Sequence, residues 1–170
     1  MKKYTSQRAK NIYQTCREAQ GLSREKASEQ MAAFPVSRIE KIEYETLSPT
    51  PYDVVQMADC YKTPELCNYF CSHHCEIGNR YVPELKISQL PNIIIETIAS
   101  LNDIAPFTNL LLQIARDGKI TDDEIKDFAV ISKKLDEVSL AINTLNLWID
   151  KTASEKNINI NLLNAEKEKL

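Results

Sequence analysis

The sequence predicts an all-α protein, and three observations indicate this fold class. Apolar residues recur at intervals of three and four along most of the chain, which is the period of a helix rather than of a strand. β-branched residues never alternate with polar ones over the length of a strand. Glycine occurs only three times in 170 residues, so turns of the kind that join strands are scarce.

Five short helices are expected before residue 75. Gly21 stands where a glycine commonly ends a first helix, and Ser23 suits the N-cap of a second. Pro35 suits the opening of a third. The fourth helix is expected to bury Val54 or Val55, a choice that the pattern leaves open. The expected helices cover about residues 6–19, 23–31, 35–42, 52–61 and 64–71.

A second helical region is expected after a linker over residues 76–91, which lacks a sustained period. Its first two helices, about 90–101 and 103–115, are separated by a break at Pro106. The segment from Thr121 to Glu124 reads as the capping box of a long helix that extends to about residue 150.

The long helix carries an apolar stripe whose members alternate by three and four, which indicates a helix–helix seam. The positions expected to face inward are Phe128, Ile131, Leu135, Val138, Ile142, Leu145 and Ile149. The expected domains are therefore an N-terminal one over 1–75, the linker 76–91, a C-terminal helical dimerisation domain over 92–150, and a frayed polar tail over 151–170.

Composition narrows the class of protein. Residues 1–41 carry nine Lys or Arg against four Glu, whereas the remainder carries twelve against twenty Asp or Glu. A basic end on an acidic body is compatible with a nucleic-acid partner. No apolar run approaches the roughly 18 residues that span a bilayer, so no membrane association is expected. Five cysteines without a secretion signal favour reduced thiols and a cytoplasmic location.

The pattern of the second and third helices is typical of a helix-turn-helix, in which two short helices pack at a fixed angle and the second enters the major groove. Arg17, the Gly21-Leu22-Ser23 entry, the Ser37–Glu43 run and the Pro51–Tyr61 segment together resemble the lambda-repressor-like, Xre-type domain. The resemblance covers about a third of the chain. It implies a five-helix DNA-binding domain, here followed by a C-terminal helical hairpin or bundle with a long helix.

The resemblance also implies roles for individual residues. Arg17 and Glu43 would form a buried ion pair that holds the domain together. The turn is about one residue longer than in the family and lacks its usual glycine. The residues expected to contact DNA, by groove or by phosphate, are Arg38, Lys41, Ser37, Arg24, Lys10 and Arg8.

A cysteine and histidine cluster leaves three interpretations open. Cys67, Cys71 and Cys75 recur at four-residue spacing, so their thiols share one helix face, and His73 or His74 follows closely. This spacing is not a standard one for zinc or iron–sulfur ligands. The pattern favours buried thiols that pack the fifth helix, with a metal site and a redox sensor as the alternatives.

Taken together, these features predict a sequence-specific DNA-binding transcription regulator. Its expected partners are double-stranded DNA and a second copy of the chain, paired through the C-terminal helices. No cofactor is expected, and no catalytic motif indicates an enzyme. The alternative is a protein-interaction adaptor that keeps the helix-turn-helix fold without reading DNA sequence.

Overall fold

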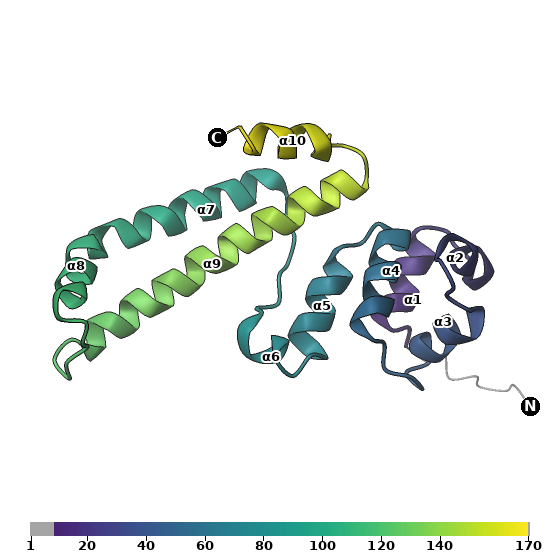
Figure 1. Cartoon of the computed structure of the whole chain (residues 1–170), viewed down its shortest axis with the longest axis horizontal. Coiled ribbons are helices and arrows are strands. Elements are labelled where there is room, and N and C mark those ends of the chain that lie inside the picture. The colour runs from purple at the N-terminus through teal and green to yellow at the C-terminus, as the bar shows by residue number, and fades with distance from the viewer. Residues whose placement is uncertain (1–8, 170) are drawn as a thin grey trace, which may run out of the picture. The chain divides into compact units, whose positions relative to one another are not determined.

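The computed structural model describes residues 9–169, apart from the side chains of residues 115–117. Across these residues the chain is helical and contains no strand, as the periodicity predicts. The chain divides into two compact units, one formed by residues up to 82 together with those from 153 onward, and the other by residues 83–152 (Figure 1).

The core of the first unit is formed by five of its described helices, at nearly the positions that the sequence predicts. They are α1 (Ile12–Ala19), α2 (Arg24–Gln30), α3 (Val36–Glu43), α4 (Pro51–Tyr61) and α5 (Glu65–His73). Their inward faces share one hydrophobic core, whose fully buried members include Ile39, Met57, Tyr61 and Leu66. Val54 is the buried member of the valine pair in α4, and Val55 is exposed.

Local capping explains where most of these helices begin. The side chains of Asn11 and Ser23 accept hydrogen bonds from backbone N–H groups in the first turns of α1 and α2. Thr50 and Asp53 form a reciprocal capping box at the start of α4, beside Pro51 in its first turn. Each cap satisfies backbone donors that have no partner inside the helix.

Two segments outside these helices differ from the sequence-based expectation. The expected linker contains a short helix, α6 (Gly78–Tyr81), before the chain becomes extended. The expected frayed tail is largely helical, because α9 continues to Ser154 and α10 (Ile160–Lys167) follows. Asn159 caps α10 by accepting from the backbone N–H of Leu162, a local signal that the polar composition obscured.

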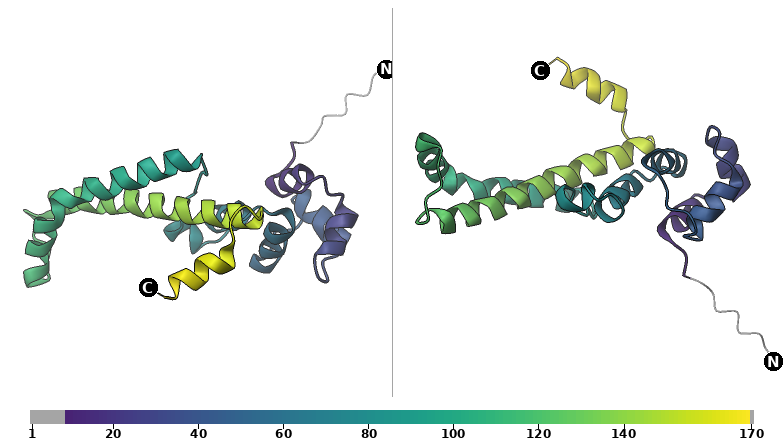
Figure 2. Two further views of the ribbon diagram at one scale, coloured as in Figure 1. Left: turned by 90° about the horizontal axis from the view of Figure 1, so that it is seen from above. Right: turned by 60° about the horizontal axis from the view of Figure 1, so that its bottom comes forward.

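The second unit is a helical hairpin. Its elements are α7 (Leu90–Ile104), a 3₁₀ turn η1 (Ala105–Phe107), α8 (Thr108–Asp117) and most of the 30-residue α9 (Ile125–Ser154). Pro106 lies in η1, so the predicted break is present. The helices α7 and α9 run side by side in Figure 1 and in the left view of Figure 2. Ile93 of α7 and Ile131 of α9 are buried in this unit.

The apolar stripe of α9 is only partly buried, contrary to the expectation that all seven positions face inward. Ile131 is buried, but Leu135 and Ile142 remain 45% and 41% exposed, and the other four are half-buried. The reason is geometric, because a single neighbouring helix covers only one side of α9. Leu135 and Ile142, seven residues apart, lie on a row outside this contact. Among the described helices, none combines the length and the apolar character that crossing a membrane requires.

Candidate nucleic-acid interface

The α2 and α3 helices are joined by a turn that packs into the core. Ala27 and Met31 on one side, and Ile39 and Ile42 on the other, are all buried in the core of the first unit. Within the turn, Phe34 is buried and its carbonyl oxygen accepts a hydrogen bond from Ser28 Oγ at 2.6 Å. The spacings of four and three residues place each pair on one face of its helix, and the turn holds the two helices in one arrangement.

A buried ionic cluster holds the end of α3. Arg17 Nε and Nη2 donate to the two carboxylate oxygens of Glu43 at 2.6 and 3.0 Å, and Glu43 is only 2% exposed. Arg17 also donates to the carbonyl oxygen of Leu22. The hydrogen bonds that Arg17 donates to Glu43 raise the pKa of its guanidinium. The pair implied by the family resemblance is therefore present, and it joins α1 to α3.

Arg24, expected beside a phosphate, is the third member of this cluster. Its Nε donates to Glu43 Oε2 at 2.7 Å, and its guanidinium lies 5.0 Å from the centre of the Tyr44 ring. Glu43 can accept two arginines because a carboxylate carries about four lone-pair sites. In this structure Arg24 contributes to the packing of α2 against α3.

Arg38, the residue most expected to read a base, is bound to Asp53 of α4. Arg38 Nε and Nη2 donate to Asp53 Oδ1 and Oδ2 at 2.7 and 2.6 Å. The same carboxylate accepts from the backbone N–H and the hydroxyl of Thr50 at 2.7 and 2.8 Å. Arg38 therefore also contributes to stability, since its guanidinium compensates a carboxylate whose side chain is 4% exposed.

The remaining expected contacts divide into two groups. Ser37 and Lys41 are exposed on α3, and neither side chain has a hydrogen-bond or ion-pair partner within residues 9–169. Lys10 is paired with Glu18 of α1. Arg8 lies outside the described residues. Ser37 and Lys41 are thus the members of the expected set whose polar groups remain available to a ligand.

Two further kinds of residue lie near α3, beside the expected contacts. Glu40 and Glu45 are exposed, so acidic groups stand beside Lys41. Tyr52 and Val55 are 63% and 47% exposed on α4. The three-residue spacing of this apolar pair was a signal that could have been read, because such residues share one helix face.

The thiols at four-residue spacing pack against the core of the first unit. Cys67, Cys71 and Cys75 are half-buried there, and burial raises the pKa of the Cys67 thiol. His74 stacks on Phe70, within the same helix end. No group of three or more potential ligands is placed to hold a metal ion in the part of the chain that the structure describes. The packing interpretation of the cysteines accounts for these positions.

The close approach of α6 to α5 accounts for the glycine at position 78, which follows the cysteines. The first turn of α6 approaches α5 so closely that a Cβ atom on Gly78 would lie 1.9 Å from the carbonyl oxygen of Cys71. The backbone N–H of Gly78 donates to Cys75 Sγ at 3.4 Å. Only a residue without a side chain fits at this position.

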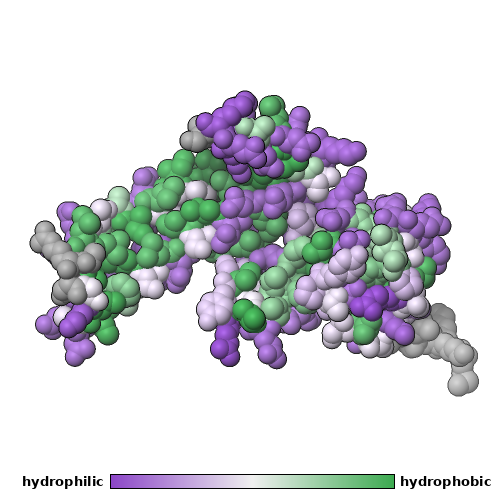
Figure 3. Space-filling model, viewed as in Figure 1, coloured by the Kyte–Doolittle hydropathy of each residue, from purple (hydrophilic) through white to green (hydrophobic). Residues whose placement is uncertain are grey.

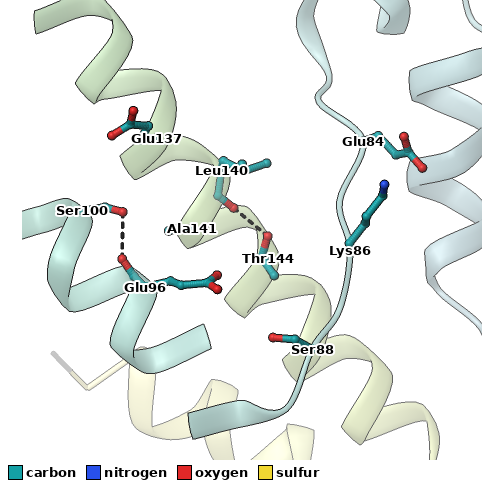
Figure 4. A pocket seen from close by; sticks show the side chains of 9 residues that line it. All are labelled: Glu84, Lys86, Ser88, Glu96, Ser100, Glu137, Leu140, Ala141 and Thr144. Carbon is teal, nitrogen blue, oxygen red and sulfur yellow. Dashed lines mark hydrogen bonds between the residues drawn. The ribbon is translucent and has the colours of Figure 1, made fainter. Parts of the chain in front are cut away.

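The second unit has an open cavity of about 610 Å³ between the extended segment, α7 and α9 (Figure 4). Its lining includes the carboxylates Glu84, Glu96 and Glu137. Two of its hydroxyl groups are already satisfied by helix carbonyls, since Ser100 donates to Glu96 O and Thr144 to Leu140 O at 2.8 Å. The acidic lining disfavours a nucleic-acid phosphate at this place.

Comparison with known proteins identifies no relative of this chain. The chain matches no protein family model, no curated protein and no solved structure.

Proposed function

We propose that the protein is a sequence-specific DNA-binding transcription regulator that presents α3 to the major groove, as an Xre-type helix-turn-helix protein does. The observation that carries the proposal is the combination of a rigidly held α3 with an outer face that keeps Ser37 and Lys41 available. A recognition helix needs both properties, because base contacts require fixed geometry and unpaired polar groups.

The buried cluster supports the rigidity that this role requires. Glu43 at the end of α3 is bound by Arg17 from α1 and by Arg24 from α2, so three helices meet at one carboxylate. Arg38 ties the start of α3 to Asp53 of α4. Each ion pair reduces the freedom of α3 to rotate, which keeps its outer residues in one register toward a duplex.

Lys41 is the residue through which the proposal is tested. A phosphate contact from one lysine weakens binding to all sequences alike and changes the slope of log K against log salt by about one. We expect Lys41→Ala to bind enriched DNA sites more weakly, with a shallower salt slope and an unchanged melting temperature. Fluorescence anisotropy at several salt concentrations measures both, using sites selected from a random DNA library by the native protein.

The matched control is Lys133→Ala, which removes the same charge from an exposed position of α9 in the other unit. It should leave the salt slope unchanged. If the native protein enriches no sequence from the library at low salt, or if both variants lose affinity equally, the DNA-binding proposal is wrong.

One observation favours a second candidate, a protein-interaction adaptor with the same fold. Glu40 and Glu45 place negative charge beside Lys41, and Tyr52 and Val55 expose apolar surface on the neighbouring α4. An apolar contact of this kind responds little to salt, whereas phosphate contacts respond steeply. The adaptor would be supported if Tyr52→Ala loses binding to a partner protein and if the affinity of the native chain for that protein changes little with salt.

A further inference from the structure

A stripe on α9, which shares four residues with the apolar stripe described above, is only partly covered by the hairpin. It starts at Phe128 and advances by four and three residues in strict alternation as far as Ile149, which is the repeat of a coiled-coil seam. Its large apolar members are Phe128, Leu135, Ile142 and Ile149, each seven residues from the next. Leu135 and Ile142 are exposed, and the outer two are half-buried.

The positions between the large residues are small or polar and carry no charge. They are Ser132, Ser139 and Asn146, and all three are exposed. Eight of the thirty residues of α9 are ionisable, yet none of them falls on this stripe. An uncharged stripe can be covered by a second helix without the desolvation cost of buried ions.

We propose that this stripe is the interface with a second copy of the chain, and that the two α9 helices cross it in antiparallel orientation. In a parallel pair each residue would face its own counterpart, so layers of two large side chains would alternate with layers of two small ones. An antiparallel pair sets a large residue against a small one in every layer. That arrangement packs evenly, and interiors pack at uniform high density.

The length of α9 sets the register. Maximum overlap of two antiparallel 30-residue helices places the two-fold axis close to the middle of Ile125–Ser154. The nearest register that alternates large with small has its axis between residues 140 and 141. Leu135 then faces Asn146 of the partner subunit, and Ile142 faces Ser139 of the partner subunit.

The α9 stripe alone is too small for a stable dimer, so we expect α7 to contribute to the same interface. The α9 stripe spans 21 residue steps, about 32 Å at 1.5 Å per residue, and a helix is about 10 Å wide. Its projected face of roughly 300 Å² falls well short of the ~800 Å² per partner in a typical specific interface. Ile94, Ile98 and Leu101 form an exposed row on α7.

Hydrophobic side chains gather over both α7 and α9 on the face that Figure 3 shows. An apolar surface that continues across two helices is typical of an interaction site. Two hairpins joined through it would form a four-helix bundle. This inference deepens the proposed function and rests on it for the use of a dimer, since two half-sites require two recognition helices.

The test measures the oligomeric state of the full-length protein without DNA, by analytical ultracentrifugation. The native chain should be a dimer, and Leu135→Lys should raise its dissociation constant about tenfold or more, because two charges then enter an apolar seam. The matched control is Leu140→Lys. Leu140 is 41% exposed, close to the 45% of Leu135, but it lies on the cavity side of α9 and should leave the dimer intact.

A charge pair tests the orientation. The double variant Leu135→Lys with Asn146→Glu should recover most of the lost affinity, because lysine and glutamate meet across the antiparallel interface. Within one chain the two positions are about 16 Å apart, so they cannot pair with each other. Circular dichroism verifies that each variant remains helical.

Each outcome decides a separate point. A monomeric native protein, or equal disruption by Leu140→Lys and Leu135→Lys, would overturn the interface. A double variant no better than Leu135→Lys alone would overturn the antiparallel pairing. An intact dimer that selects no DNA would leave the interface standing and count against the regulator alone.

Discussion

Arg38 of α3 and Asp53 of α4 form a two-pronged ion pair, with both guanidinium-to-carboxylate distances at or below 2.7 Å. The same carboxylate closes the capping box of α4 through Thr50. One side chain therefore connects the outer face of α3 with the start of the next helix. In the proposed DNA-binding role, a substitution of Arg38 would therefore change binding and stability together.

We expect Arg38→Ala to lower the melting temperature by about 2–4 °C, because it leaves the buried carboxylate of Asp53 without its cation. A double-mutant cycle with Asp53→Asn, measured by thermal unfolding, checks the cause. If the pair is responsible, Arg38→Ala costs less in the Asp53→Asn background than in the native protein. Equal costs in the two backgrounds would mean that the ion pair contributes nothing.

The pH dependence of stability should report on Asp53. Burial raises the pKa of this carboxyl group, but the hydrogen bonds from Arg38 and Thr50 outweigh it, so the pKa lies below its ordinary value. The stabilisation is therefore complete above the unfolded-state pKa of about 3.9 and is lost as pH falls through the lower folded value. Urea denaturation at pH 5 and pH 3 measures how much the free energy of unfolding falls on acidification, which we call the acid loss. This acid loss should be smaller in Asp53→Asn than in the native protein.

The matched control for this measurement is Asp59→Asn, which changes an exposed carboxylate of the same helix. Its acid loss should equal that of the native protein. An Asp53→Asn variant that loses as much stability at pH 3 as the native chain would contradict the assignment.

The buried carboxylate of Glu43 should be the most sensitive polar site in the first unit. Glu43→Ala leaves Arg17, itself 5% exposed, with only Glu18 at 3.8 Å as a counter-charge, and breaking such a buried pair costs about 3–5 kcal/mol. Chemical denaturation measures the loss. Glu40→Ala, an exposed change on the same helix, should stay within about 0.5 kcal/mol. Similar losses in both variants would show that burial of the pair is unimportant.

The backbone of the turn between α2 and α3 is strained at Ala33, and a glycine at this position should relieve the strain. Ala33 has a φ of +55°, a left-handed conformation that costs an L-residue about 1–2 kcal/mol. Glycine adopts it freely but loses about 0.5–1 kcal/mol through its more flexible unfolded chain. Ala33→Gly should therefore stabilise the protein by roughly 0.5–1 kcal/mol in urea denaturation. Ala32→Gly, next to it without a positive φ, should not stabilise.

The contact between α5 and α6 should tolerate no side chain at Gly78. An added methyl group would overlap the Cys71 carbonyl oxygen, so Gly78→Ala should cost about 3 kcal/mol through displaced backbone. Gly118→Ala provides the comparison: its Cβ would meet no atom within 4 Å, although its φ of +67° still strains an alanine. We expect the smaller loss at Gly118, of about 1 kcal/mol, and the reverse order would refute the close approach.

How far the sequence predicts this structure depends on the range of the interactions involved. Ser23 before α2 and Pro106 at the break in the second unit act on backbone groups within a few residues, so their effects could be read directly. The helical period placed Ile39 and Ile42 in the core for the same reason. The short helix α6 was missed because it depends on a contact with α5.

What the sequence determined by itself is the succession of helices from α1 to α5 and the inward face of each one, since caps, proline and periodicity are local properties of the chain. Only the tertiary structure decided which of the expected DNA-contacting cations remain available, because Arg24 of α2 and Arg38 of α3 are paired with carboxylates 19 and 15 residues away. It likewise decided that Leu135 and Ile142 are uncovered. A heptad pattern indicates that a helix has an apolar side. Which neighbour covers this side depends on how the helices pack in three dimensions.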